Sequence, residues 1–185
     1  MMTLWNVHHM YSVEGDHVYS FWNITSGTPI DKCYTEMLYD VTMQNINKDT
    51  TILIQGLGGA VLPARLALKN ISSTVIEISQ SVHATYINEF KNIIEEWSPN
   101  IEEHMTIKIE DALHFFPNHY DVIVSDIPDC YRDVSHGCIT MIRKFIHMRK
   151  KIIANVWTRN KNRFVALLGG EIIADNGQGV SVWLS

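Results

Sequence analysis

The chain has 185 residues, of which 46% are hydrophobic and 19% are charged, so one domain can bury a core without disulfides or metals. A net charge of −5 argues against general nucleic-acid and membrane-surface binders, although a local basic patch is compatible with it. No segment resembles a signal peptide or a membrane span, so we expect a cytoplasmic protein without membrane partners. The cysteines Cys33, Cys130 and Cys138 form no CxxC pair, so neither a disulfide framework nor a zinc site is expected, and the compartment is expected to be reducing.

The N-terminal residues predict a β-hairpin. Residues 3–24 alternate in places around Gly15, and a hairpin of about 20 residues is not stable alone. We therefore expect a docking or oligomerisation element over residues 1–26, separate from a nucleoside-binding domain over 27–185, and a homo-oligomer (dimer or tetramer). The aromatic residues that favour self-association are Trp5, Tyr19 and Trp22. Three histidines lack a partner at metal-ligand spacing, so no metal is expected: His8, His9 and His17.

A helix is predicted from about residue 31 to residue 45, with Asp31 at its start. Its apolar stripe follows helical spacing, which is typical of a helix that packs on a core. Tyr34 and Glu36 are polar residues on its first turns, just ahead of the next strand. At least one of them is expected to face a pocket.

Residues 50–80 predict the strand, glycine turn, helix and strand of a nucleotide-binding unit. The expected elements are a strand at 51–55, a helix at 62–70 and a strand at 74–78. Glu77 follows Gly56 by 21 positions, the spacing at which such a unit places a carboxylate against ribose hydroxyls. The turn that would lie close to the ligand contains Gly56, Gly58 and Gly59.

Two classes of nucleotide compete for this pattern. A dinucleotide fingerprint requires Gly or Ala where this chain has Val61, which weakens the nicotinamide interpretation. A looser glycine turn suits an adenosine ligand without a pyrophosphate, such as S-adenosylmethionine or its decarboxylated form. A third possibility is that the glycines only make a tight turn.

Acidic residues follow the next two predicted strands. After a helix at 83–97, a strand at 105–109 leads to Asp111, which either accepts the amino group of adenine or caps a helix at 112–116. A strand at 120–125 leads to Asp126 and Asp129, whose like charges favour one of them as a base near neutral pH. The alternative is a loop rich in caps and turns. Residues 130–137 are expected to form a lid.

The C-terminal third completes an α/β sheet. A helix at 139–150 carries basic residues that fit a solvated face better than a nucleic-acid groove: Arg143, Lys144, Arg149 and Lys150. A strand at 151–157, a helix at 160–168 and a closing hairpin over 171–184 follow. The predicted fold is a Rossmann-like, mostly parallel sheet with an antiparallel C-terminal hairpin.

Residues 27–157 resemble the spermidine synthase family, aminopropyltransferases built on the class I methyltransferase fold. Residues 34–38 are similar to that family's Tyr-His/Gln-Glu-Met motif, and residues 56–61 lie where the family has its glycine-rich loop. The resemblance implies substrate contacts from Tyr34, Thr35 and Glu36. It also implies a ribose-binding acid, an adenine-binding pair and two catalytic-loop aspartates, which here are Glu77, then Asp111 with Ala112, then Asp126 with Asp129.

The chain departs from this family at two places. Gly59 stands where the family has an aspartate that holds the amino end of the decarboxylated donor, and Cys130-Tyr131 replaces the expected gate. The main hypothesis is aminopropyl transfer to a small amine, in which Asp126 accepts a proton, Tyr34 orients the amine, and Asp129 or Glu36 holds the distal ammonium. The alternatives are an S-adenosylmethionine-dependent methyltransferase and a non-catalytic nucleoside-binding or partner-binding protein.

Overall fold

The computed structural model describes the backbone of residues 9–13, 16–20, 22–23, 28–29, 34–128, 130, 133–175, 177 and 179–184, and the side chains of these residues from 34 onward except 179–181. The predicted hairpin is confirmed, because β1 (His9–Val13) pairs antiparallel with β2 (Asp16–Ser20). A second ladder, of β3 (Trp22–Asn23) with β4 (Thr28–Pro29), was not predicted. The aromatic and histidine side chains of this region lie outside the described part, so its docking, its oligomerisation and the boundary at residue 26 stay predictions.

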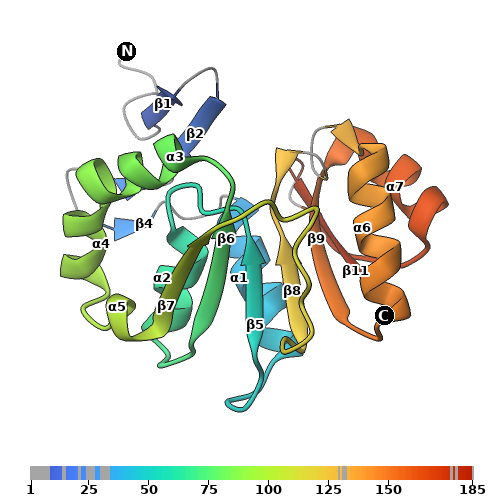
Figure 1. The fold of residues 1–185 in the computed structure, drawn as a ribbon, viewed down its shortest axis with the longest axis horizontal. Coiled ribbons are helices and arrows are strands. Elements are labelled where there is room, and N and C mark those ends of the chain that lie inside the picture. The colour runs from blue at the N-terminus through green and yellow to red at the C-terminus, as the bar shows by residue number, and fades with distance from the viewer. Residues whose placement is uncertain are drawn as a thin grey trace.

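One seven-stranded sheet organises the rest of the chain, in the order β10-β11-β9-β8-β5-β6-β7 (Figure 1). The five parallel strands are β5 (Ile52–Gln55), β6 (Ser73–Glu77), β7 (Met105–Ile109), β8 (Val122–Ser125) and β9 (Lys151–Trp157). β11 (Gly179–Leu184) is antiparallel to β9 and to β10 (Glu171–Asp175). Since two reversals cancel, β10 runs in the direction of β9, and β11 is the reversed strand of this sheet.

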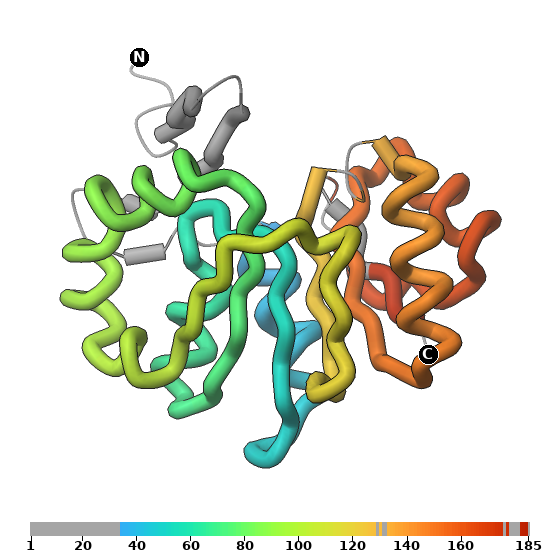
Figure 2. Tube along the Cα trace, viewed as in Figure 1, coloured from blue at the N-terminus to red at the C-terminus, as the bar shows by residue number. Residues whose placement is uncertain are grey.

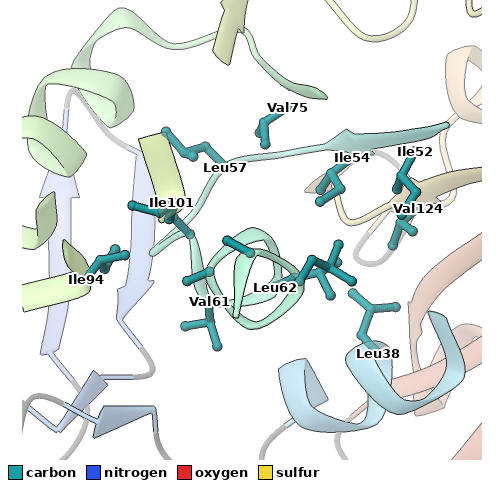
Figure 3. Close-up of a cluster of buried hydrophobic side chains, with 14 of the residues drawn as sticks. Leu38, Ile52, Ile54, Leu57, Val61, Leu62, Val75, Ile94, Ile101 and Val124 are labelled. Atoms are coloured by element: carbon teal, nitrogen blue, oxygen red, sulfur yellow. The ribbon is translucent and has the colours of Figure 1, made fainter. Parts of the chain in front are cut away.

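Helices cover both faces of the sheet because its strands carry apolar residues on both sides. Ile52 and Ile54 belong to a core beneath one helical layer, which Figure 3 shows, and Leu53 belongs to a second core on the opposite face. The first layer holds α1 (Tyr34–Asn45), α2 (Val61–Ala67), α3 (Gln80–Thr85), α4 (Lys91–Trp97) and α5 (Ile101–His104), with a π-helical turn (Tyr86–Phe90) between α3 and α4. The second layer holds α6 (His136–His147) and α7 (Lys161–Leu168), which follows a 3-10 turn (Thr158–Asn160) (Figure 2).

The predicted helix at 112–116 is wrong, because residues 112–114 form a turn and 115–117 have no regular structure. The carboxylate of Asp111 accepts a hydrogen bond from the backbone N–H of Leu113 at 2.9 Å, which closes a local turn instead of a helix. Pro117 removes the N–H that would have continued a helical ladder. The connection from β7 to β8 is therefore a loop that packs against the second core through residues such as Leu113 and Phe115.

The expectation that the cysteines form no disulfide is also wrong. Cys130 and Cys138 are bonded, with Cα atoms 5.6 Å apart, and both side chains are fully buried. A missing CxxC motif was a poor guide, because the bond joins Cys130, five residues after β8, to Cys138 in the first turn of α6. The segment between these cysteines also holds Val134 at φ 48°, a left-handed conformation that is costly for a β-branched side chain. The bond therefore fixes a strained loop close to Asp126.

We expect Cys138→Ser to lower the free energy of unfolding by about 2.5 kcal/mol, the cost of freeing a loop this short. Urea unfolding of the oxidised proteins measures the difference. The matched control is Cys33→Ser, which removes a thiol that is not part of this bond. Equal unfolding midpoints for wild type and Cys138→Ser, or three titratable thiols in the oxidised unfolded chain, would contradict the bond.

Candidate functional site

Four neighbouring strands carry a single row of residues at or near their carboxyl ends, at one edge of the sheet. Gln55 pairs in register with Ile76 and with Ser125, and Ser125 pairs with Ala154. One residue further along each strand lie Glu77, Gly56, Asp126 and Asn155. Because side chains alternate between faces along a strand, these four positions share the face of the first core, to which the residues two positions earlier belong: Val75, Ile54, Val124 and Ile153. The register therefore brings the predicted ribose acid and the predicted base to the same edge and face.

Asp126 is held at both carboxylate oxygens. The hydroxyl of Tyr34 donates to Oδ2 at 3.2 Å, and the Nδ2 group of Asn155 donates to Oδ1 at 2.7 Å. Burial raises the pKa of Asp126 above its ordinary value, while the hydrogen bonds from Asn155 and Tyr34 act in the opposite direction and lower it. An oriented carboxyl with a raised pKa is a stronger base, once ionised, than an exposed aspartate.

The glycine turn touches the loop that carries this carboxyl. Gly56 has φ +96°, and a Cβ atom placed on it would lie 2.5 Å from the backbone oxygen of Asp126. Gly58 also has a positive φ, +48°, but no described atom lies within 4 Å of a Cβ placed there. The turn is thus closed toward Asp126 and open at Gly58.

Glu77 ties the turn to the second strand. Its Oε2 accepts a hydrogen bond from the backbone N–H of Leu57 at 3.1 Å, and its Oε1 accepts one from Ser79 at 2.9 Å. The residue is only 8% exposed, so two backbone donors satisfy a nearly buried carboxylate. Each oxygen keeps a further lone pair for a ligand hydroxyl.

The predicted adenine pair lies next to Glu77. The backbone N–H of Glu110 donates to the Glu77 carbonyl at 3.0 Å, which brings the start of the β7–β8 loop beside the acid. Asp111 accepts from Leu113 and hydrogen-bonds Nδ1 of His114 at 2.7 Å, while Ala112 is buried. Ile78, which follows Glu77, is 65% exposed. The loop that carries Asp111 and Ala112 therefore begins beside the strand end that carries Glu77.

Three further predicted site residues are Asp129, Thr35 and Glu36. Asp129 lies outside the described residues. Thr35 and Glu36 occupy the first turn of α1 beside Tyr34, and Thr35 is buried. Sequence reasoning did not select Asn155, although a polar residue inside the apolar run at 152–156 was a usable signal.

The side chains that the structure describes contain no group of three His, Cys, Asp or Glu residues able to hold a metal ion. Among the helices within the described ranges, none combines the length and the apolar character needed to cross a bilayer.

Known proteins resemble the chain in structure. No protein-family model matches the sequence, and no curated protein matches it. A Streptococcus pneumoniae protein assigned as a tRNA (m1A22) methyltransferase, bound to S-adenosyl-L-methionine, superposes with a TM-score of 0.56 at 14% identity over 81% of this chain and 70% of that one. The Pyrococcus abyssi tRNA (uracil-54, C5)-methyltransferase, bound to S-adenosyl-L-homocysteine, superposes with a TM-score of 0.60 at 11% identity. The superposition covers 97% of this chain and 44% of that one.

A third protein, from Methanococcus maripaludis and assigned as an S-adenosyl-L-methionine-dependent methyltransferase, gives a TM-score of 0.57 at 19% identity over 84% of this chain and 88% of that one. Identities this low establish the fold alone. Together with the strand order, they confirm the predicted α/β, Rossmann-like fold with a reversed C-terminal strand. The chain spans less than half of the P. abyssi enzyme.

Proposed function

Because the chain has the class I methyltransferase fold, we propose that it binds S-adenosylmethionine above the glycine turn and transfers the methyl group to a nucleophile beside Asp126. The observation that carries this proposal is the row of Glu77, Gly56 and Asp126 on one face of adjoining strands. Ligands of open α/β sheets bind at the carboxyl ends of the strands, which is where this row lies.

The donor would be held mainly by hydrogen bonds to its sugar. Both oxygens of Glu77 are fixed by backbone donors and keep lone pairs for the ribose hydroxyls. Adenine would lie against the exposed side chain of Ile78, with Asp111 and Ala112 at its edge. Gly56, Gly58 and Gly59 would leave room for the remainder of the donor.

Transfer requires an acceptor lone pair in line with the methyl carbon and the sulfur. The new bond forms as the carbon–sulfur bond breaks, and its electron pair goes to sulfur, so that S-adenosylhomocysteine leaves as a neutral thioether. The acceptor proton would pass to the Asp126 carboxylate, which Tyr34 and Asn155 orient.

A second candidate is aminopropyl transfer from decarboxylated S-adenosylmethionine to a small amine. The contact between Tyr34 and Asp126 favours it, because the resembled family uses that tyrosine and that aspartate together. Asp129 or Glu36 would then hold the distal ammonium, with Thr35 as a further substrate contact. Gly59 argues in the other direction, since it offers no carboxylate to the donor's amino end.

Calorimetry with S-adenosylmethionine, S-adenosylhomocysteine and decarboxylated S-adenosylmethionine tests the proposal, and product mass then identifies the transferred group. We expect Glu77→Gln to weaken binding of S-adenosylmethionine by tenfold or more. The amide group of Gln carries N–H donors at one of the two positions where the carboxylate of Glu77 accepts hydrogen bonds. The control is Glu110→Gln, an exposed neighbouring carboxylate. If the folded protein bound none of these three compounds, the proposal would be wrong and a non-catalytic protein would be the remaining hypothesis.

A further inference from the structure

Charge is distributed very unevenly along this acidic chain. Residues 134–170 contain eight of the fifteen Lys and Arg residues and none of the twenty Asp and Glu residues. That segment carries a formal charge of +8 and the remainder carries −13, which together give the net −5. A net charge therefore says little about the surface that this segment forms.

The segment folds into one part of the molecule. It comprises α6, β9 and α7, and the two helices lie side by side over the second face of the sheet (Figure 1). We call its cationic residues the α6–α7 basic layer: Arg143, Lys144, Arg149, Lys150, Lys151, Arg159, Lys161 and Arg163. Because α6 alone is 12 residues long, the layer extends over about 18 Å, a span that can meet several phosphates.

Two cations of this layer donate hydrogen bonds to uncharged groups and so keep their positive charge unpaired by these contacts. Arg143 donates to the carbonyl of Leu167 at 3.0 Å and Lys150 to that of Asn118 at 2.9 Å, and neither acceptor is charged. Lys161 pairs with Asp175 at 2.8 Å, and Asp121 is close enough to Lys150 and Lys151 for attraction. Within the described residues, these two carboxylates lie beside the eight cations, so the segment keeps a large positive charge.

Aromatic rings accompany these cations. The Nζ atom of Lys144 lies 3.3 Å from the ring centroid of Phe116, which is 62% exposed, and Cζ of Arg159 lies 4.4 Å from the ring of Trp157. A cation beside an accessible ring can meet a phosphate while the ring stacks on a base. Anionic lipid surfaces attract the same residue types, but only unpaired bases also offer flat faces that stack on the rings, and this favours a nucleic acid.

The layer begins at the candidate site. Asn155, which hydrogen-bonds Asp126, lies two residues before Trp157, the last residue of β9. Arg159 lies two residues after Trp157. Ser135 caps α6 and stands in the loop that follows Asp126. The row formed by Glu77, Gly56 and Asp126 faces the first core, whereas the layer covers the second, so a bound strand would reach the row by crossing the carboxyl edge of the sheet near Arg159.

We propose that the α6–α7 basic layer binds the phosphates of a single-stranded nucleic acid segment, and that a nucleotide of this segment is the methyl acceptor. The second half rests on the proposed function, whereas the binding surface does not. This proposal differs from the expectation, based on net charge, that the chain has no nucleic-acid partner.

Fluorescence anisotropy with a labelled 20-nucleotide RNA, the same sequence as DNA, and vesicles containing phosphatidylserine tests the surface. The double variant Arg143→Gln with Arg163→Gln removes one exposed cation from each helix; its control, Lys48→Gln with Lys69→Gln, makes the same change in net charge elsewhere. We expect the first to bind RNA or DNA about tenfold more weakly, with a log–log salt slope reduced by about 1.4, and the control to bind within twofold of wild type.

Equal losses in the two double variants would overturn the proposal, as would wild-type protein that binds neither nucleic acid, or that binds only the vesicles. Preference for RNA or for DNA identifies the class of acceptor, and either supports the surface. Calorimetry with S-adenosylmethionine on the same variants separates the two proposals, because substitutions in the layer leave donor binding unchanged. Nucleic-acid binding without donor binding would refute the proposed function and keep the surface.

Discussion

Asp126→Asn should lower kcat/KM by about 10²- to 10⁴-fold and leave the affinity for S-adenosylmethionine within twofold of wild type. The substitution keeps the shape of the side chain but replaces the basic carboxylate, which would take the proton of the methyl acceptor, by an amide that is not basic. Loss of a general base typically lowers the rate by this amount. Steady-state rates give the first quantity and calorimetry the second. Equal losses of turnover and of donor affinity would assign Asp126 to donor binding instead.

The same variant carries a prediction about stability. Burial raises the pKa of Asp126 in the folded state, so the folded protein prefers the protonated carboxyl. Its contribution is fully present below the unfolded-state pKa and is lost as pH rises through the folded-state pKa. As pH rises through the folded-state pKa, ionisation of this desolvated group therefore costs stability, and the amide of Asp126→Asn avoids this cost.

We expect the melting temperature of Asp126→Asn to equal or exceed that of wild type at pH 7, and this advantage to shrink as pH falls toward 4. Differential scanning fluorimetry across that range measures it. A loss of activity together with a gain of stability identifies a group retained for chemistry, because a structural hydrogen-bond acceptor would show losses of both. If the variant were less stable than wild type at pH 7, the hydrogen bonds that Tyr34 and Asn155 donate to Asp126 would require the charged carboxylate.

The order of strands and helices could be predicted because hydrophobic periodicity is a local signal. Residues 51–55 and 151–157 are apolar runs of strand length, and each is followed by a helical pattern. The spacing of Gly56 and Glu77 also predicted the row of site residues, since parallel strands with helical crossovers bring their carboxyl ends to one edge. The sequence could therefore predict which residues lie at this edge of the sheet, because topology alone determines their position.

What failed depended on contacts between distant segments. Asn155 is meaningful only once β9 lies beside β8, and the bond between Cys130 and Cys138 only once the fold brings these two residues together. The missing helix after β7 reflects competition between a side-chain cap and a helical ladder, in which Asp111 favours the turn. Net charge is a weak guide to partners for another reason, because it averages over segments of opposite charge that the fold keeps apart.

Gly56→Ala should destabilise the protein by about 3 kcal/mol or more. A Cβ at this position would meet the backbone oxygen of Asp126 at 2.5 Å, and a backbone carbonyl cannot move aside as the end of a side chain can. The positive φ of +96° adds the cost of a conformation that alanine rarely adopts. Urea unfolding measures the loss, and the displaced turn should also weaken binding of S-adenosylmethionine.

Gly58→Ala separates these two causes. Its φ of +48° also requires a left-handed backbone, but no described atom lies within 4 Å of the added methyl group, so only the conformational cost of about 1–2 kcal/mol applies. The difference between the two variants therefore measures how tightly the glycine turn is packed on the loop of Asp126. Equal destabilisation would mean that the turn and the loop can separate, and a donor held by one could not then be aligned with a base held by the other.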